Sequence, residues 1–147
     1  MPDPVQAILA FDFGFKRIGI ACGDTLTRSA APRAASQARN GEPDWTDLAK
    51  HIKALQPKLL VVGEPYNADG TPSSIAPAVR AFGAELERRF GLPVKWVDER
   101  WSSLEATEAL KAQRASGERK RRVTREDIDS AAAAVILNRW FMETGDE

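Results

Sequence analysis

Residues 8–23, ILAFDFGFKRIGIACG, decide the fold that this sequence predicts. Ile8 to Phe13 is a short apolar run that enters a glycine turn, and Arg17 to Gly23 returns as a second run. Two such runs on either side of Gly14-Phe15-Lys16 predict two strands joined in a hairpin. Asp12 is the one charged residue of the first run, where a buried carboxylate costs desolvation free energy unless a positive group compensates it.

Beyond the hairpin, the patterns of helix and strand alternate. A weaker strand pattern lies within Ala30 to Ala38, and Glu42-Pro43-Asp44 opens an amphipathic helix that Pro57 stops. Lys58 to Gly63, KLLVVG, has the near-continuous apolar pattern of a strand covered on both faces. The later elements are expected at about residues 77–90 (helix), 94–97 (strand), 102–110 (helix) and 126–142 (helix), the last with Thr124 as its N-cap. This alternation predicts a single α/β domain over residues 1–147 with a partly parallel sheet.

The bulk composition is that of an ordinary globular protein. Of the 147 residues, 43% are hydrophobic and 29% are charged. The longest apolar stretches fall short of the roughly 20 residues that a membrane helix needs, and the N-terminus does not resemble a signal peptide. Cys22 is the single cysteine, which excludes an internal disulfide and a cysteine zinc cluster. We therefore expect a cytoplasmic protein with no membrane partner.

A zero net charge hides a local basic segment. Between residues 111 and 125, one acid, Glu118, faces seven basic residues: Lys111, Arg114, Arg119, Lys120, Arg121, Arg122 and Arg125. Such a cluster favours contact with the phosphate backbone of a nucleic acid. The alternative is a solvated charged loop without a partner.

Three sets of acids lie where α/β proteins place ligand-binding groups, and each also has an ordinary structural explanation. Asp12 ends the first strand, although an aspartate before glycine can also cap its own turn. Asp98 and Glu99 end the strand of residues 94–97, at the carboxyl edge where ligands bind in such folds. There the alternative is a solvated strand end in which Arg100 pairs locally.

Asp129 is the least expected of the acids. It precedes Ala132, Ala133 and Ile136 by three, four and seven residues, so it continues the apolar face of the last helix. A carboxylate on a core-facing stripe is costly unless it meets a cation. The alternative is a first-turn acid that the helix dipole favours, a role that Asp127 fits better.

Together these acids predict a site for divalent metal ions. Mg²⁺ prefers oxygen ligands and commonly uses a few carboxylates together with water and substrate phosphate. A pair of such ions about 4 Å apart can activate water and stabilise the leaving oxygen in phosphodiester cleavage. The basic segment would supply the attraction to the phosphates.

Five ordered runs resemble the YqgF family, also called the pre-16S rRNA nuclease or Holliday junction resolvase family, which belongs to the ribonuclease-H-like superfamily. The runs are 11–19 (FDFGFKRIG), 61–65 (VVGEP), 67–70 (NADG), 98–100 (DER) and 129–132 (DSAA). The resemblance extends from about Ile8 to Phe141. It implies a ribonuclease-H-like α/β fold with a mixed five-stranded sheet flanked by helices.

The resemblance also implies roles for individual residues. It makes Asp12, Glu99 and Asp129 the catalytic carboxylates that hold Mg²⁺ or Mn²⁺. Its motifs place Lys16, Arg17 and Arg100 where cations would contact phosphate. The basic segment adds Arg119, Lys120, Arg121 and Arg122 as expected nucleic-acid contacts, on the charge pattern alone. The implied activity is a metal-dependent endonuclease in 5′-end maturation of pre-16S rRNA, with resolution of branched DNA as the alternative, by a monomer or homodimer.

Two positions depart from the family pattern. Phe15 replaces a small or hydroxyl-bearing residue in the hairpin, and Glu64 stands where leucine is common. Glu64 adds an acid at a strand end, as a candidate metal ligand ranked below Glu99. Two other function classes also remain: a phosphotransferase, because the hairpin resembles the first phosphate loop of actin-like ATPases, and a nucleic-acid-binding module without catalysis.

Overall fold

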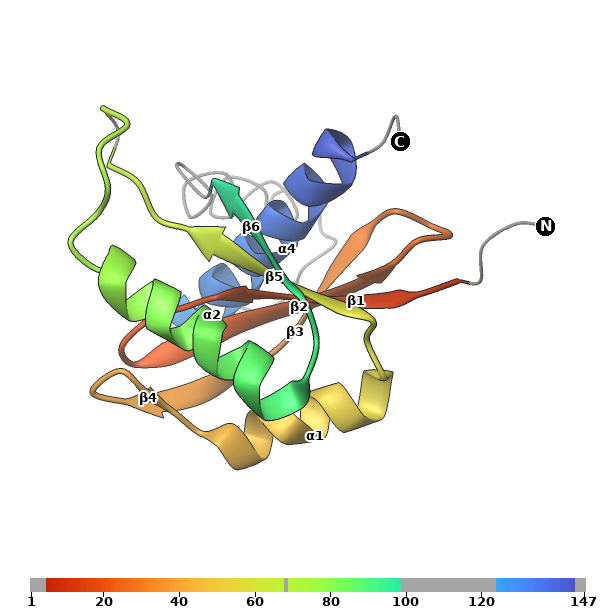
Figure 1. Ribbon diagram of the computed structural model, residues 1–147, viewed down its shortest axis with the longest axis horizontal. Coiled ribbons are helices and arrows are strands. Elements are labelled where there is room, and N and C mark those ends of the chain that lie inside the picture. The colour runs from red at the N-terminus through yellow and green to blue at the C-terminus, as the bar shows by residue number, and fades with distance from the viewer. Residues whose placement is uncertain (1–4, 68, 99–123, 145–147) are drawn as a thin grey trace.

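The computed structural model describes residues 5–67, 69–98 and 124–144. Within these residues a single six-stranded sheet has the order β4-β3-β2-β1-β5-β6 (Figure 1). The strands are β1 (Ala7–Asp12), β2 (Arg17–Asp24), β3 (Ala30–Arg39), β4 (Glu42–Pro43), β5 (Leu59–Glu64) and β6 (Val94–Asp98). The helices are α1 (Trp45–Leu55), α2 (Ala76–Phe90) and α4 (Arg125–Glu143). The helix expected at residues 102–110 and the basic residues 111–122 lie outside the described residues.

The sheet is mixed, as the sequence predicted. Strands β1, β2 and β3 form an antiparallel meander, whereas β5 and β6 run parallel to β1. The sheet has one strand more than the five expected. The additional strand is β4, which has two residues and pairs with Ala38 and Arg39. Glu42 and Pro43 were expected to open a helix; instead α1 begins after Asp44, whose carboxylate accepts a hydrogen bond from the Asp47 N–H. No described helix combines the length and apolar character needed to cross a membrane.

The alternation of side chains along β1 divides the interior into two cores. Leu9 and Phe11 point to the side of α1 and α2, whereas Ile8 and Ala10 point to the side of α4. Figure 1 shows α2 and α4 on opposite sides of the sheet. The strands thus separate an α1/α2 layer from an α4 layer.

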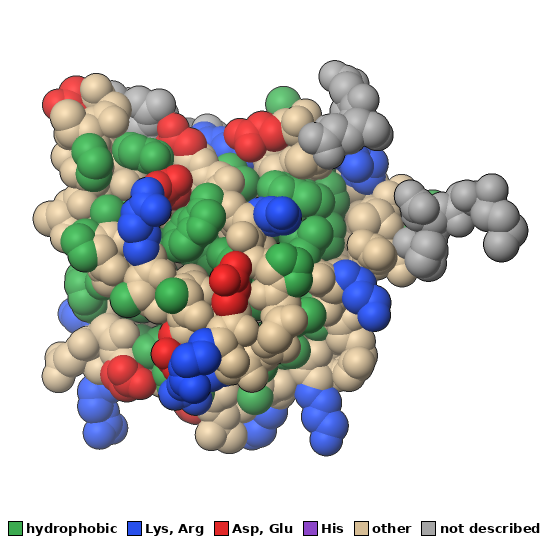
Figure 2. All heavy atoms as spheres, viewed as in Figure 1, with side chains coloured by type: hydrophobic (Ala, Val, Ile, Leu, Met, Phe, Trp, Pro, Cys, Tyr) green, Lys and Arg blue, Asp and Glu red, His purple; other side chains and the backbone are tan. Residues whose placement is uncertain are grey.

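The α1/α2 layer is built from large aromatic side chains. The Phe82 ring of α2 lies 5.8 Å from Phe11, 5.1 Å from Phe13 and 5.9 Å from Trp45, measured between ring centroids. Aromatic pairs at these separations stabilise a core beyond their buried area. The outer surface over this layer mixes acidic, basic and apolar side chains on the face in view (Figure 2).

The α4 layer is closer packed at one position. A Cβ atom added to Gly19 of β2 would lie 1.9 Å from the backbone oxygen of Asp129, so only glycine permits this approach. Helix α4 begins at Arg125, within one residue of the predicted start. Thr124 and Asp127 form a capping box there. The Thr124 side chain accepts a hydrogen bond from the Asp127 N–H, and the Asp127 side chain accepts one from the Thr124 N–H. The start of α4 is therefore fixed against the centre of the sheet.

Candidate active site

Asp12 lies at the carboxyl end of β1 and faces α4. Its register partner in β2 is Gly19, and opposite residues of an antiparallel pair project to the same face of the sheet. Two residues earlier, Ala10 packs in the α4 core. The Asp12 carboxylate therefore lies on the α4 side, next to the point where the helix comes closest.

Asp129 reaches the same point from the first turns of α4. Its backbone abuts Gly19, the residue paired with Asp12. Paired Cα atoms of antiparallel strands are about 4.5–5.5 Å apart, so the two aspartates are neighbours across one glycine. The structure thus brings together two of the three carboxylates that the sequence singled out.

Arg17, at the start of β2, is the immediate partner of Asp129. Its Nε donates a hydrogen bond of 2.8 Å to Asp129 Oδ2. The side chains are 21% and 28% exposed, respectively, so the ion pair is only partly shielded from water. Arg17 and Gly19 are two residues apart in β2 and therefore lie on the same face of the sheet, the face that Asp12 also occupies. The neighbouring Lys16 is exposed.

An irregularity in β3 opens a cavity next to this group. Ile18 pairs with Ser36 and Ile20 with Arg33, so Ala34 and Ala35 together lie opposite Gly19. Bulges of this kind bend a strand and are frequent beside functional sites. The cavity, about 640 Å³, is lined by Arg17, Pro32, Arg33, Ala34, Ala35, Thr124, Arg125, Glu126, Asp127 and Ser130. It lies between the bulge and the first turns of α4.

Glu64 is not part of this group. It lies on the same face of β5 as Leu60 and Val62, which pack in the α1/α2 core. Its carboxylate forms an ion pair with Arg80 of α2. Partial desolvation and the Glu64 carboxylate raise the pKa of Tyr66, which hydrogen-bonds to Glu64. The structure therefore assigns Glu64 to a contact on the opposite face of the sheet from Asp12 and Asp129.

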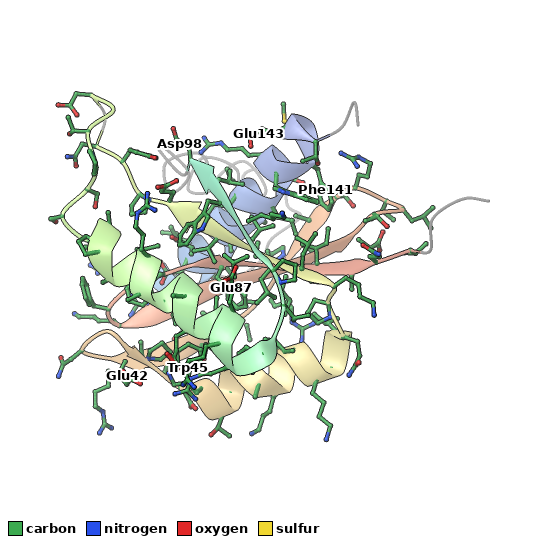
Figure 3. The ribbon with its side chains drawn as sticks, in the orientation of Figure 1. Glu42, Trp45, Glu87, Asp98, Phe141 and Glu143 are labelled. Atoms are coloured by element: carbon green, nitrogen blue, oxygen red, sulfur yellow. The ribbon has the colours of Figure 1, made fainter. Side chains whose placement is uncertain are left out.

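The third carboxylate, Glu99, lies outside the described residues, as do Arg100 and residues 119–122. The residue before Glu99 is Asp98, at the carboxyl end of β6 (Figure 3). Nη1 of Arg139 in α4 donates a 2.9 Å hydrogen bond to the Asp98 carbonyl oxygen. Helix α4 therefore contacts both the end of β6 and the centre of the sheet.

The chemistry of the described donors suits a hard divalent cation. Two carboxylates, Asp12 and Asp129, converge on one face, and carboxylate oxygens are the ligands that Mg²⁺ and Mn²⁺ prefer. No group of three metal-binding side chains occurs among the residues that the structure describes.

Two features of this site were missed by reasoning from the sequence. Gly19 was interpreted only as part of a motif, although a glycine inside a strand can indicate a close backbone approach. Arg17 was assigned to the nucleic acid, whereas the structure pairs it with a residue 112 positions later in the chain. No local pattern in the sequence indicates such a contact.

Comparison with solved structures defines the class of fold. RuvC of Thermus thermophilus in complex with a Holliday junction substrate superimposes with a TM-score of 0.60, at 13% identity over 96% of each chain. The fowlpox virus resolvase bound to Holliday junction DNA gives a TM-score of 0.55, at 12% identity over 96% of this chain and 99% of that one. The fold is therefore that of the ribonuclease-H-like resolvases, as the sequence predicted.

Comparison of sequences then defines the family. The RuvX family, described as Holliday junction resolvase, matches residues 6–143, and the chain belongs to this family. A protein of Nitrosococcus oceani is 40% identical over 142 residues, 97% of this chain and 90% of that protein. A protein of Coxiella burnetii is 42% identical over 147 residues and the full length of both chains. Both relatives carry the name "Putative pre-16S rRNA nuclease". The resemblance to the YqgF family is confirmed.

Proposed function

We propose that Asp12 and Asp129 are the metal-binding part of a nuclease active site, which Glu99 completes. The observation that carries this proposal is the meeting of the two aspartates at Gly19 on one face of the sheet. Glu99 directly follows β6 and comes two residues after Val97, whose side chain packs in the α4 core. Asp98 and Glu64 are left out of the proposed ligand set.

The chain's own residues position the reacting groups. A bound Mg²⁺ or Mn²⁺ would polarise a phosphodiester and lower the pKa of a bound water. Asp12 is held by the pairing of β1 with β2, and Asp129 by the capping box and the contact with Gly19. The backbone positions of both aspartates are therefore set before substrate binds. Groups positioned in advance in this way lower the entropic cost of bringing reactants together.

The substrate that we propose is RNA, specifically the 5′ end of pre-16S rRNA during ribosome assembly in the cytoplasm. Support comes from relatives at 40% and 42% identity that carry the pre-16S rRNA nuclease name over nearly the whole chain. The second candidate is a Holliday junction in DNA, which the family description and the resolvase folds favour. The much lower identity of RuvC, 13%, makes it the weaker guide to the substrate.

Parallel cleavage assays on the two substrates test the proposal. The purified protein, with Mg²⁺ or Mn²⁺, is offered a pre-16S rRNA fragment and a four-way DNA junction in separate reactions. We expect metal-dependent cleavage of the RNA that is lost in Asp12→Asn. The matched control is Asp47→Asn in α1, which removes one charge from the other layer. Cleavage of the junction alone would transfer the assignment to DNA, and full activity of Asp12→Asn would exclude the proposed site.

The basic segment provides an independent test of nucleic-acid binding. If Arg119, Lys120, Arg121 and Arg122 contact phosphates, each lost contact reduces the dependence of log affinity on log salt by about 0.7–0.9. Neutralising Arg119, Arg121 and Arg122 should therefore weaken RNA binding and flatten the salt dependence. An unchanged slope would assign the segment to a solvated loop. Light scattering measures the mass of the protein and of its RNA complex in the same titrations. It would show whether the RNA-binding species is a monomer or a homodimer.

A further inference from the structure

We propose that Arg17 changes partners when the active site is loaded. In the structure it forms an ion pair with Asp129; when a divalent cation binds the aspartates, Arg17 turns to a backbone phosphate in the adjacent cavity. Metal binding and nucleic-acid binding would then be coupled through one side chain. This inference rests on the proposed function, because it assumes that Asp129 binds a metal.

The first observation is the nature of the Arg17–Asp129 ion pair. The Nε–Oδ2 distance of 2.8 Å is that of a charge-assisted hydrogen bond. Both side chains nevertheless remain partly exposed, at 21% and 28%. Ion pairs with this exposure are weak because water and salt screen them. The contact is therefore well formed and can still be exchanged.

The second observation is the electrostatics around Asp129. Asp12 lies on the same face of the sheet, across Gly19, so two carboxylates repel each other there unless a cation lies between or beside them. Arg17 supplies that cation. A divalent ion would do the same more strongly and would repel the guanidinium. Asp129 has a second oxygen that could bind metal while Arg17 stays in place, and the experiment below distinguishes that arrangement.

The third observation is that Arg17 also lines the cavity of about 640 Å³. The first turn of α4 lines the same cavity, and helix N-termini attract phosphate. Ser130 lines it too; its side chain is 3% exposed and its hydroxyl has no hydrogen-bond partner among the described residues. Glu126 and Asp127 also line the cavity and offset the charges of Arg33 and Arg125, so an anion there needs a further positive charge. Arg17 is the side chain that can supply it.

A titration with Mn²⁺ tests the metal half of the proposal. Isothermal titration calorimetry compares the wild-type protein with Arg17→Gln and with Lys16→Gln, which removes the same charge from an exposed neighbour. Removing a competing ion pair should tighten Mn²⁺ binding by about threefold to fivefold in Arg17→Gln. Lys16→Gln should change it clearly less. Unchanged or weaker binding in Arg17→Gln would overturn the exchange and make Arg17 a fixed support for Asp129.

The same titration separates this inference from the proposed function. Wild-type protein that binds no Mn²⁺ would refute the metal site itself, and the exchange with it. Wild-type protein that binds Mn²⁺ with an affinity equal to that of Arg17→Gln would refute only the exchange. Because binding is measured as heat, neither outcome depends on cleavage.

Binding of a short single-stranded RNA without metal tests the other half. Asp129→Asn removes the partner of Arg17 and should raise RNA affinity in fluorescence anisotropy. The gain should disappear in the double variant Arg17→Gln/Asp129→Asn. Glu126→Gln is the matched control, because it removes one charge from the same helical turn and should act independently of Arg17. If Asp129→Asn raises the affinity equally with and without Arg17, the gain is a general charge effect and the exchange is refuted.

Discussion

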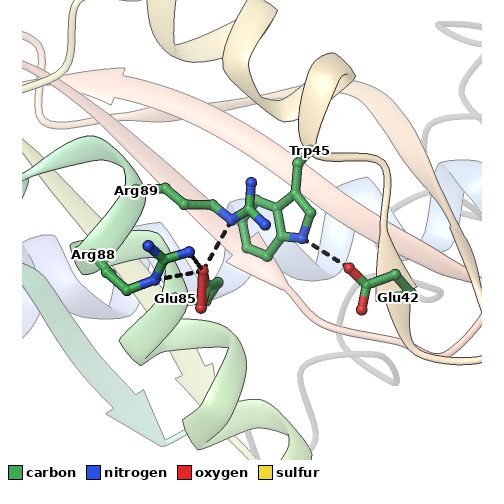
Figure 4. A network of polar contacts seen from close by, with 5 residues as sticks. All are labelled: Glu42, Trp45, Glu85, Arg88 and Arg89. Carbon is green, nitrogen blue, oxygen red and sulfur yellow. Dashed lines mark hydrogen bonds and ion pairs between the residues drawn. The ribbon is translucent and has the colours of Figure 1, made fainter.

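The two layers on either side of the sheet are built in different ways. On the α1/α2 side, Phe82 packs among three aromatic rings, and a polar network covers them from outside: Arg89 stacks over Trp45 at 4.3 Å and pairs with Glu85, while Trp45 donates to Glu42 (Figure 4). On the α4 side, the contact at Gly19 is backbone against backbone. Large side chains stabilise the first layer, and close approach positions carboxylates in the second.

This difference predicts that stability and activity respond to changes in different layers. Small changes in a core of closely packed rings should lower the free energy of unfolding. None of these side chains belongs to the proposed active site. We expect the carboxylates of the proposed site to contribute little to stability, whereas their position would determine whether a metal can bind. The four predictions below are ordered by their expected effect on the free energy of unfolding.

The largest loss of stability should come from the α1/α2 core. Leu86 of α2 is fully buried, so Leu86→Ala should lower the free energy of unfolding by about 2–5 kcal/mol. Leu26→Ala makes the same change at a residue that is 73% exposed, and should cost roughly 0.5 kcal/mol or less. Urea denaturation measures both. Equal losses in the two variants would contradict the contribution of Leu86 to the α1/α2 core.

Gly19→Ala should reduce both stability and activity. Its Cβ would overlap the Asp129 backbone oxygen, so α4 must shift, at a cost of about 1–3 kcal/mol. The shift moves Asp129 away from Asp12, and cleavage should fall sharply. The contrasting variant is Gly91→Ala, which meets nothing within 4 Å but strains a residue at φ +66°. It should lose about 1 kcal/mol and keep its activity. Comparable activity in both variants would separate Gly19 from the site.

Asp129→Asn should abolish metal-dependent cleavage with only a small change in stability. The amide keeps the shape of the side chain but loses the charge that binds the cation and Arg17. The lost ion pair is partly exposed, so the cost should be below about 1 kcal/mol. Nuclease rate and thermal melting without metal, measured on the same sample, check this. Retained cleavage would remove Asp129 from the catalytic group.

The smallest effect concerns His51 in α1. Burial, and then the Arg33 cation, lower the pKa of His51 in the folded protein, against a smaller opposing effect of Asp47. The unfolded chain therefore takes up this proton first as the pH falls below about 6.5, so stability should decline with acidity from that point down to the folded pKa. His51→Gln should flatten the dependence of Tm on pH in this range. An unchanged slope would show that other groups cause it.

The sequence predicted the features that depend on local patterns. The hairpin that carries Asp12 follows from two apolar runs around a glycine, and the start of α4 follows from Thr124 and the acids of the first turn. Among the described residues, the strands and helices were therefore predictable except for β4, because a two-residue strand is determined by its pairing with β3 and leaves no periodic pattern. The helix expected at residues 102–110 stays a prediction.

The candidate site was less predictable, because it depends on which face of the sheet each residue occupies. Glu64 and Asp12 both end apolar strands, and nothing local distinguishes them. The register places Asp12 opposite Gly19 and leaves Glu64 facing α2, where Arg80 pairs with it. The ion pair between Arg17 and Asp129 could not be predicted for the same reason, because only the folded sheet brings Arg17 next to α4.

The contact between Gly19 and Asp129 also bears on when the protein becomes active during its synthesis. The ribosome produces Asp12 and Gly19 early, whereas Asp129 emerges more than a hundred positions later on α4, the last of the described elements. Until then the face of the sheet formed by Ile8, Ala10 and Val61 lacks α4, which is the described helix that packs on it. A growing chain therefore holds Asp12 without Asp129. The two aspartates can meet only after α4 has been synthesised.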